Sequence, residues 1–175
     1  LGLIPTASTT ATLAFGDALA IALLDKRGFK EEDFAVLHPG GSLGKKLLTQ
    51  VDDLMHIGSK IPTIYKNSPL KDVIMEISSK KLGVAIVVDQ DDKVLGIVTD
   101  GDLRRLMEKM KKDIFKTTAE EMMTANPKTI EKHALAARAL QIMEKYSITS
   151  LIITNGNKSP TGIIHLHDIL KAGVV

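Results

Sequence analysis

Two short stretches of the chain, Gly96–Leu103 and Gly162–Ile169, each join an apolar run to a polar turn that opens a helix. In each stretch an aspartate, Asp102 or Asp168, follows the glycine by six residues. A carboxylate there can accept protons from two neighbouring hydroxyl groups, and the free N–H groups at the helix start favour a nearby anion. Both stretches could therefore contact a hydroxyl-bearing, anionic ligand.

The first stretch also has a purely structural interpretation. Thr99 or Asp100 can cap the following helix, and Asp102 can stabilise the helix dipole. Arg104 and Arg105 come next, where they could reach a phosphate or form a solvent-exposed face. The sequence leaves both interpretations open.

The second stretch raises the question of a metal site. His165 and His167 share a face if the strand continues through them, with Asp168 beside them. A strong metal site usually needs a third ligand with the right geometry, so we predict none. His56 and His133 lie in or near turns, and we expect both at the surface.

The two stretches belong to an internal repeat. The second lies 66 residues after the first, and the same offset relates Thr63-Ile64 to Thr129-Ile130. It also relates the apolar run Val84–Val88 to Ser150–Thr154. A duplication of this length indicates two copies of one unit, each built as strand, helix, strand, strand and helix.

The first copy contains one run, Val84–Val88, that is apolar throughout and should be a strand buried on both faces. The other expected elements of this copy are a helical turn at 52–55, a strand at 62–65, a helix from the Ser68-Pro69 cap to Gly83, a turn at 89–92, a strand at 93–98 and a helix from Asp100 to about Met110.

A polar connection at 111–117 leads into the second copy. Its expected elements are a turn at 120–123, a strand at 128–130, a helix from Ala134 to Tyr146, a hairpin turn at 155–157 and a last helix from about His167 to Gly173. A small sheet with helices on one face leaves its other face uncovered. The two units should therefore pack sheet to sheet, which creates a cleft between them.

Residues 1–48 lie outside the repeat. Ala11–Lys26 has helical apolar spacing and ends before Gly28; Asp17 lies on its apolar stripe, as a hydrogen-bonding residue or a site carboxylate. The glycine-rich stretch His38–Lys45 is either a domain-boundary loop or part of a ligand site. Ser42 could cap the helix that follows.

Composition bears on which classes of protein and partner fit this chain. The 23 basic and 21 acidic residues leave a net charge of +2 without a basic patch, so we expect no nucleic-acid partner. No cysteine is present, which suits a cytoplasmic protein. No apolar run approaches the ~18 residues that span a bilayer, so we expect no membrane segment. Because the chain opens in mid-pattern without methionine, we expect a fragment of a longer protein.

The duplicated Gly-x-x-(Thr/Ser)-x-x-Asp motif resembles that of a pair of CBS domains, the Bateman module, which binds adenosyl and other nucleotides in an inter-domain cleft. The resemblance implies a tandem α+β fold with 51–112 as the first domain and 113–175 as the second. It also implies that Asp102 and Asp168 contact ribose hydroxyls and Thr99 contacts ribose or phosphate. His165 departs from the motif.

The first 50 residues are similar to the end of a sugar-isomerase (SIS) domain and its linker, as found in D-arabinose-5-phosphate isomerases. The similar segments are Pro5–Thr10, Gly16–Ala20, His38–Lys45 and Asp53–His56. Such enzymes interconvert D-ribulose 5-phosphate and D-arabinose 5-phosphate through an enediol, at the entry to the Kdo sugar of lipopolysaccharide. The resemblance assigns His38 to the active site. The other catalytic residues would lie upstream, so this chain alone should not catalyse.

The resemblance implies two ligand clefts and no required cofactor. The first would be lined by Thr63, Ile64, Gly83, Val84, Ala85, Thr99 and Asp102, and the second by Thr129, Ile130, Thr149, Ser150, His165 and Asp168. The ligand would be a regulatory nucleotide or a CMP-sugar. Two alternatives stay open: a ligand-free oligomerisation module, and the CBS pair of a related phosphosugar isomerase from another pathway. All three imply a homo-oligomer, a dimer or a tetramer.

Overall fold

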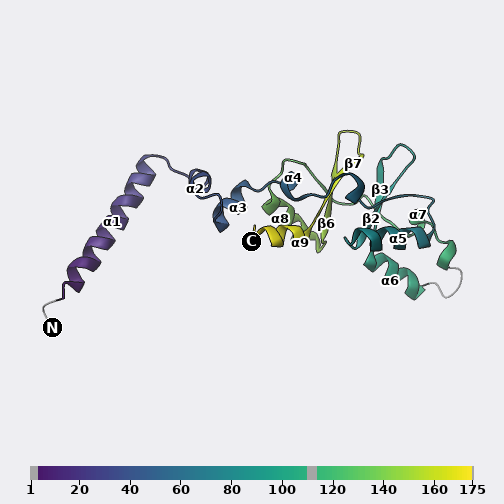
Figure 1. Ribbon diagram of the computed structural model, residues 1–175, viewed down its shortest axis with the longest axis horizontal. Coiled ribbons are helices and arrows are strands. Elements are labelled where there is room, and N and C mark those ends of the chain that lie inside the picture. Colours follow the sequence, from purple (N-terminus) through teal and green to yellow (C-terminus); the bar gives the residue numbers. More distant parts are fainter. Residues whose placement is uncertain (1–3, 110–113, 175) are drawn as a thin grey trace.

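The computed structural model describes residues 4–109 and 114–174, and Figure 1 shows a helical arm that leads into two sheet-containing modules. Gly41 holds the position before the third helix and makes no side-chain cap, so the expected Ser42 cap is wrong; Ser42 is the first helical residue. The arm consists of α1 (Thr6–Lys26), α2 (Glu31–Leu37) and α3 (Ser42–Leu48).

Helix α1 stands away from the rest of the molecule, and none of its residues is buried (Figure 1). Leu13, Phe15, Leu19 and Ile21 point to different sides because successive residues turn by about 100°. The helix is therefore apolar all round rather than striped, and Asp17 is as exposed as its neighbours. A helix apolar on all sides needs other structure around it.

The length and hydropathy of α1 would allow it to cross a membrane, which corrects the expectation that no segment of the chain would do so. The core helix of a globular protein satisfies the same two criteria.

The first sheet has the order β1-β2-β3-β4. β2 is buried at every residue, as its uninterrupted apolar sequence predicts. It pairs parallel with β1 and antiparallel with β3, and β4 extends the sheet antiparallel to β3. The strands are β1 (Thr63–Tyr65), β2 (Val84–Val88), β3 (Val94–Thr99) and β4 (Thr124–Ala125).

The second sheet repeats this plan with the order β5-β6-β7. Its central strand is parallel to β5 and antiparallel to β7. The predicted hairpin turns are confirmed, since Asp89 and its equivalent Asn155 each accept two backbone N–H groups of the turn at 2.9–3.0 Å. The strands are β5 (Thr129–Ile130), β6 (Ser150–Thr154) and β7 (Pro160–His165).

Helices cover the outer face of each sheet. Both ends of α5 differ from the prediction: Pro69 precedes the helix as its cap residue, and the helix stops at Lys80 because Lys81 adopts φ +59°, before Gly83 is reached. Helix α8 begins at Ala136 rather than at the predicted Ala134. The helices are α4 (Val51–Leu54), η1 (Gly58–Lys60), α5 (Leu70–Lys80), α6 (Asp100–Lys109), η2 (Ile114–Lys116), α7 (Ala119–Met122), α8 (Ala136–Tyr146) and α9 (Leu166–Ala172).

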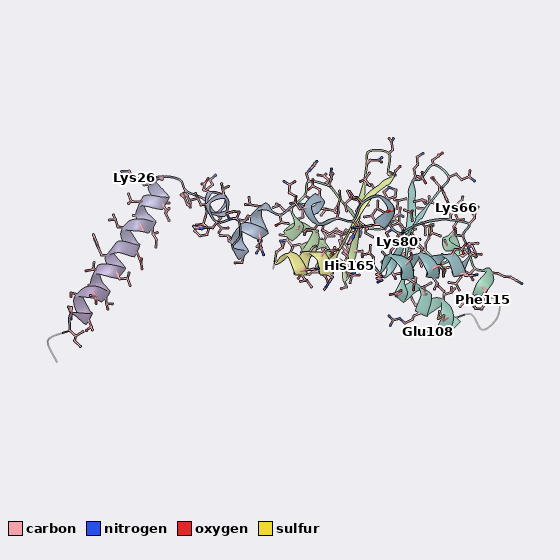
Figure 2. All side chains as sticks on the ribbon, viewed as in Figure 1. Lys26, Lys66, Lys80, Glu108, Phe115 and His165 are labelled. Atoms are coloured by element: carbon pink, nitrogen blue, oxygen red, sulfur yellow. The ribbon has the colours of Figure 1, made fainter. Side chains whose placement is uncertain are left out.

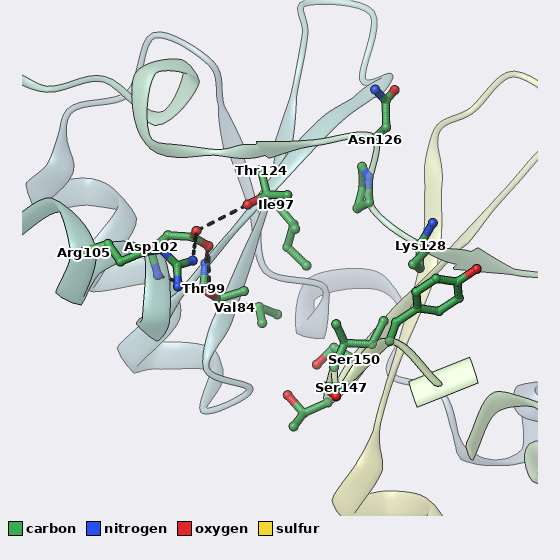
Figure 3. Close-up of a pocket in the computed structure, with 14 residues that line it drawn as sticks. Val84, Ile97, Thr99, Asp102, Arg105, Thr124, Asn126, Lys128, Ser147 and Ser150 are labelled. Atoms are coloured by element: carbon green, nitrogen blue, oxygen red, sulfur yellow. Dashed lines mark hydrogen bonds and ion pairs between the residues drawn. The ribbon is translucent and has the colours of Figure 1, made fainter. Parts of the chain in front are cut away.

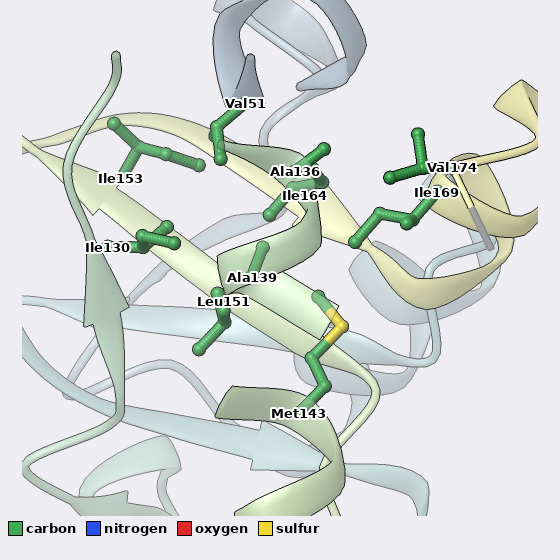
Figure 4. Packing of buried hydrophobic residues seen from close by; sticks show 10 residues of the cluster. All are labelled: Val51, Ile130, Ala136, Ala139, Met143, Leu151, Ile153, Ile164, Ile169 and Val174. Atoms are coloured by element: carbon green, nitrogen blue, oxygen red, sulfur yellow. The ribbon is translucent and has the colours of Figure 1, made fainter. Parts of the chain in front are cut away.

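Three apolar clusters hold the modules together. One lies between sheet and helices in the first module, and its counterpart in the second module is drawn in Figure 4. The third joins the inner faces of the two sheets, which confirms the predicted sheet-to-sheet packing. Its buried members are Leu82, Val84, Ile86, Val88, Ile152 and Ile163.

The segment that enters each module packs against the other module. Val51, at the start of the first copy, is fully buried in the core of the second module. Conversely, Ala119 and Met122 belong to the core of the first module, and β4 joins its sheet. The two copies therefore share segments in space, and the division at 112/113 stays a prediction about the sequence.

Candidate functional site

A pocket of about 490 Å³ lies between the two modules, beside the start of α6 (Figure 3). It is bounded on one side by residues of the first module and on the other by the loop that precedes β6. The lining residues are Val84, Ile97, Thr99, Asp102, Arg105, Thr124, Asn126, Pro127, Lys128, Tyr146, Ser147, Ile148, Thr149 and Ser150.

Asp102 is the charged group at the centre of the pocket's polar wall, and it is only 8% exposed. Its Oδ2 accepts the backbone N–H of Thr99 at 2.8 Å and the Thr99 hydroxyl at 2.6 Å. Its Oδ1 accepts Arg105 at 2.6 Å and the Thr124 hydroxyl at 3.3 Å, as the dashed lines in Figure 3 show. The carboxylate is thus held by three different segments of the chain.

The structure joins the two interpretations of Thr99 and Asp102. The Asp102 N–H donates to Thr99 Oγ1 at 3.3 Å while Asp102 Oδ2 accepts the Thr99 N–H, which is the reciprocal arrangement of a capping box. Both residues also line the pocket. Asp102 Oδ2 therefore caps the start of the helix, and Oδ1 accepts the hydrogen bonds from Arg105 and Thr124.

Opposing effects act on the pKa of Asp102. Burial disfavours the charged form and by itself raises the pKa. The hydrogen bonds donated by Thr99 and the nearby guanidinium of Arg105 favour the charged form, and together they lower the pKa below its ordinary value. Asp102 is therefore an anion at neutral pH.

The opposite wall contains a buried hydroxyl. Ser150 is 7% exposed, and its Oγ has no hydrogen-bond partner among the described residues. Alternation along β6 places Ser150 on the same face as Ile152, which packs between the sheets. A buried polar atom without a partner costs free energy, which a ligand group could recover.

The far end of the pocket combines an aromatic ring with a cation. The Lys128 ammonium lies 4.3 Å from the centre of the Tyr146 ring, a cation–π contact. Asn126, two residues before Lys128, adopts φ +53° and turns the chain at the pocket rim. The pocket therefore has a cation at each end, Arg105 and Lys128, with apolar Val84 and Ile97 between them (Figure 3).

The equivalent position in the second module is arranged differently. His56 Nε2 lies 2.9 Å from Asp168 Oδ2, and both side chains are 27% exposed. His56 is therefore not the surface residue expected from its turn. His165 accepts the N–H of His167 at 3.1 Å, in the role of a helix cap. Burial lowers the pKa of His165, nearby Asp168 raises it, and His167 and His56 lower it; the net direction is down.

The structure groups the predicted ligand residues in another way. Val84, Thr99 and Asp102 of the expected first cleft share one pocket with Thr149 and Ser150 of the expected second cleft. The reason is the sheet-to-sheet packing, which sets β2 of one module against the start of β6 of the other. The predicted residues outside the lining of this pocket are Thr63, Ile64, Gly83, Ala85, Thr129, Ile130, His165 and Asp168.

Thr129 and Ile130 line a separate depression with Arg138 and Thr154, on the outer side of the second sheet. His38 lies in the arm, where its exposed ring contacts Phe34 at a centroid distance of 4.7 Å. Neither position adjoins the pocket. The roles predicted for these residues stay predictions.

Sequence reasoning missed part of the pocket, above all Thr124 and the segment after it. A usable signal existed: Glu121-x-Met123-Thr124 repeats Asp53-x-Met55-His56 at an offset of 68 residues. That match pairs Thr124 with His56, as the structure does through their contacts with Asp102 and Asp168.

Residues 51–109 and 119–175 both match the family model of the CBS domain. The chain belongs to this family. The CBS pair also resembles solved structures in fold. With the structure titled CBSX2 in complex with AMP it shares a TM-score of 0.63 and 19% identity, over 72% of this chain and 96% of that one. A second similar structure is the CBS domain pair of protein MJ0100 in complex with 5-methylthioadenosine and S-adenosyl-L-methionine. It shares a TM-score of 0.63 and 23% sequence identity with this chain, over 70% of this chain and 94% of that one.

Relatives with greater sequence identity extend beyond the CBS pair. All 175 residues align with arabinose 5-phosphate isomerase KdsD of Pseudomonas aeruginosa at 46% identity and with that of Salmonella typhi at 48%. The match includes the helical arm. The chain spans 53% of each relative, so it corresponds to about half of their length.

Proposed function

We propose that this chain is the C-terminal regulatory part of an arabinose 5-phosphate isomerase, and that its CBS pair binds a nucleotide or nucleotide sugar. The sequence identity of 46–48% over the whole chain supports the first part. The reaction would be the interconversion of D-ribulose 5-phosphate and D-arabinose 5-phosphate, in the cytoplasm. The related phosphosugar isomerase of another pathway remains the alternative parent.

The arm supports an origin in a larger catalytic domain. Helix α1 is apolar on all sides and exposed, so it needs further structure around it. A SIS domain upstream would provide that cover and would bring His38 into an active site completed by other residues. In the longer protein, His38→Ala should reduce isomerase turnover by at least tenfold without changing the response to a regulatory nucleotide.

One observation carries the proposal for the CBS pair: a buried carboxylate, Asp102, and a buried hydroxyl without a partner, Ser150, line the same pocket. Asp102 would accept ribose hydroxyls. The apolar side chains of Val84 and Ile97 would contact the base. Arg105 and Lys128 supply positive charge at the two ends.

The contacts of the segment that follows the arm provide a route from this pocket to a catalytic domain. The Val51 N–H donates to Ala134 at 2.8 Å, which joins the start of the first CBS copy to the second module. His56, five residues later, contacts Asp168. A ligand that changes the packing of the two modules would therefore act on the segment that follows α3.

The melting temperature of this chain with AMP, ATP, CMP and CMP-linked Kdo tests the ligand. A compound at 100 times its dissociation constant should stabilise the fold by about 2.7 kcal/mol, a shift of several degrees. Asp102→Asn should abolish the shift, whereas Asp168→Asn, the equivalent change outside the pocket, should preserve it. If no compound raises the melting temperature, nucleotide binding is excluded.

A second candidate is a ligand-free oligomerisation module. Exposed apolar side chains on the helical side of the first module favour it, namely Met75, Met107 and Phe115, which are 56–74% exposed. These residues would contact a second copy in a homo-oligomer. Light scattering of Met75→Glu and of a control, Lys71→Glu, tests this: only the first should lower the measured mass, and an unchanged mass would exclude this surface.

A further inference from the structure

The hydrogen-bonding capacity of Asp102 is already used within the protein. A carboxylate has about four acceptor positions. Thr99 takes two of them through its N–H and hydroxyl, Arg105 takes the third, and Thr124 takes the fourth. Ligand hydroxyls can therefore bind Asp102 only if one of these donors leaves.

The donors differ in how readily they can leave. The two bonds from Thr99 are part of the start of α6, and breaking them would unwind its first turn. The Thr124 bond is long, at 3.3 Å, and belongs to a side chain fixed in β4. The Arg105 side chain is 62% exposed and reaches Asp102 across one helical turn, so it can swing away.

Displacing Arg105 separates a guanidinium from a buried carboxylate at 2.6 Å. Ligand hydroxyls can replace the bond to Asp102, but the released cation then needs an anion of its own. In the pair with Asp102 the Arg105 nitrogens already lie 3.5–3.8 Å from the position of an added Cβ at Gly101, so an anion that approaches the first turn of α6 meets the guanidinium there. The N–H groups of that turn favour a negative charge as well.

We infer that Arg105 is a specificity-determining residue that leaves Asp102 for the phosphate of an incoming nucleotide. This inference rests on the proposed nucleotide function of the pocket. A nucleoside without phosphate disrupts the Arg105–Asp102 pair and offers the guanidinium nothing in return. A nucleotide replaces both sides of the pair, so the pocket selects ligands that carry a phosphate next to a vicinal diol.

The chain contains a matched control next to this residue. Arg104 has the same charge, lies on the same helix and is exposed like Arg105, but it is not among the residues that line the pocket. Loss of overall positive charge is the same in Arg104→Gln and Arg105→Gln. Only the second variant removes the counter-ion of Asp102.

The test is calorimetric titration of this chain with two matched pairs, AMP with adenosine and CMP with cytidine. In the wild type we expect the nucleotide of at least one pair to bind about tenfold or more tightly than its nucleoside. In Arg105→Gln the ratio should fall to near one, because nucleotide affinity drops and nucleoside affinity holds or improves. Arg104→Gln should keep the wild-type ratio, and Arg105→Lys should fall between.

The possible results distinguish the proposed exchange at Arg105 from the nucleotide site itself. If nucleotides bind and Arg105→Gln leaves the ratio at its wild-type value, the exchange is wrong while the nucleotide site stands. The same holds if Arg104→Gln reduces the ratio as much. If the wild type binds neither member of either pair, and ATP and CMP-linked Kdo also fail to bind, the nucleotide site itself is wrong and the exchange fails with it.

Discussion

Asp102 and Asp168 occupy the same place in the two CBS copies, yet their surroundings differ in one respect that matters. Asp102 is paired with an exposed arginine and two threonines, and it lines a pocket between the modules. Asp168 is paired with His56, which is held in place by backbone bonds to Ile163 at 2.8 and 3.1 Å. The same backbone frame can thus present a carboxylate to a ligand or use it to tie two segments together.

The residues at the ends of the equivalent helices α5 and α8, Lys80 and Tyr146, also differ in their surroundings. Tyr146, the last residue of α8, lines the pocket. Its equivalent Lys80, the last residue of α5, donates a hydrogen bond to the Ser59 carbonyl at 2.6 Å. This bond ties α5, whose Lys80 is labelled in Figure 2, to η1. The two copies therefore yield one pocket suited to a ligand, beside Asp102, and one position where the carboxylate of Asp168 is paired with His56.

The largest expected difference between the copies concerns the glycines of their motifs. A methyl group at Gly96 would lie 2.5 Å from Met123 Sδ and 2.9 Å from the Thr124 carbonyl oxygen. At Gly162 it would lie 2.7 Å from Met55 Sδ, but 3.3 Å from the nearest backbone atom. Gly96→Ala should destabilise the fold by about 1–3 kcal/mol, and Gly162→Ala by less, because a methionine side chain moves more easily than backbone.

Chemical denaturation of the two glycine variants measures this difference. Gly156→Ala is the control, since an added methyl group there meets nothing within 4 Å. Equal losses at Gly96 and Gly162 would show that the two entering segments are held alike.

The two aspartates should differ by a smaller amount. Asp102→Ala removes the carboxylate that caps the start of α6 and leaves the Thr99 N–H without its acceptor, which should cost about 1–2 kcal/mol. Asp168→Ala loses one partly exposed hydrogen bond with His56, which should cost about 0.5–1 kcal/mol. Urea unfolding of both variants measures the order, and the reverse order would mean that the His56 contact is the stronger anchor.

The smallest effect is a pH dependence that only the second copy should show. Burial lowers the pKa of His165, so the folded chain resists a proton that the unfolded chain accepts below about pH 6.5. The contribution of neutral His165 is therefore present above that pH and lost as the pH falls through it. Asp102, whose pKa is also lowered, loses its contribution only in the more acidic range, below about pH 4.

Melting temperatures at pH 7.5 and 5.5 test this effect. His165→Asn should lose less stability between the two pH values than the wild type does. The control is His133→Asn, a largely exposed histidine in the same copy. An unchanged pH dependence in His165→Asn would show that His165 does not cause the loss of stability at pH 5.5.

The repeat, the continuously buried β2 and the helix start at Asp100 were predictable because each depends on neighbours in the sequence. The pocket was only partly predictable, since Asp102 and Ser150 meet through packing between sheets rather than through spacing. His56 and Asp168 are 112 residues apart, and nothing local in either sequence indicates their contact. The stop of α5 at Lys81 was missed because the following Gly83 is the residue that ordinarily ends a helix.

The most direct test of the central contrast is the number of nucleotides that one chain binds. Isothermal titration with whichever of AMP or CMP binds more tightly should give one site per chain, abolished by Asp102→Asn and retained in Asp168→Asn. Two equivalent sites per chain, or one site that Asp168→Asn removes, would contradict the division between a ligand pocket at Asp102 and an internally paired Asp168.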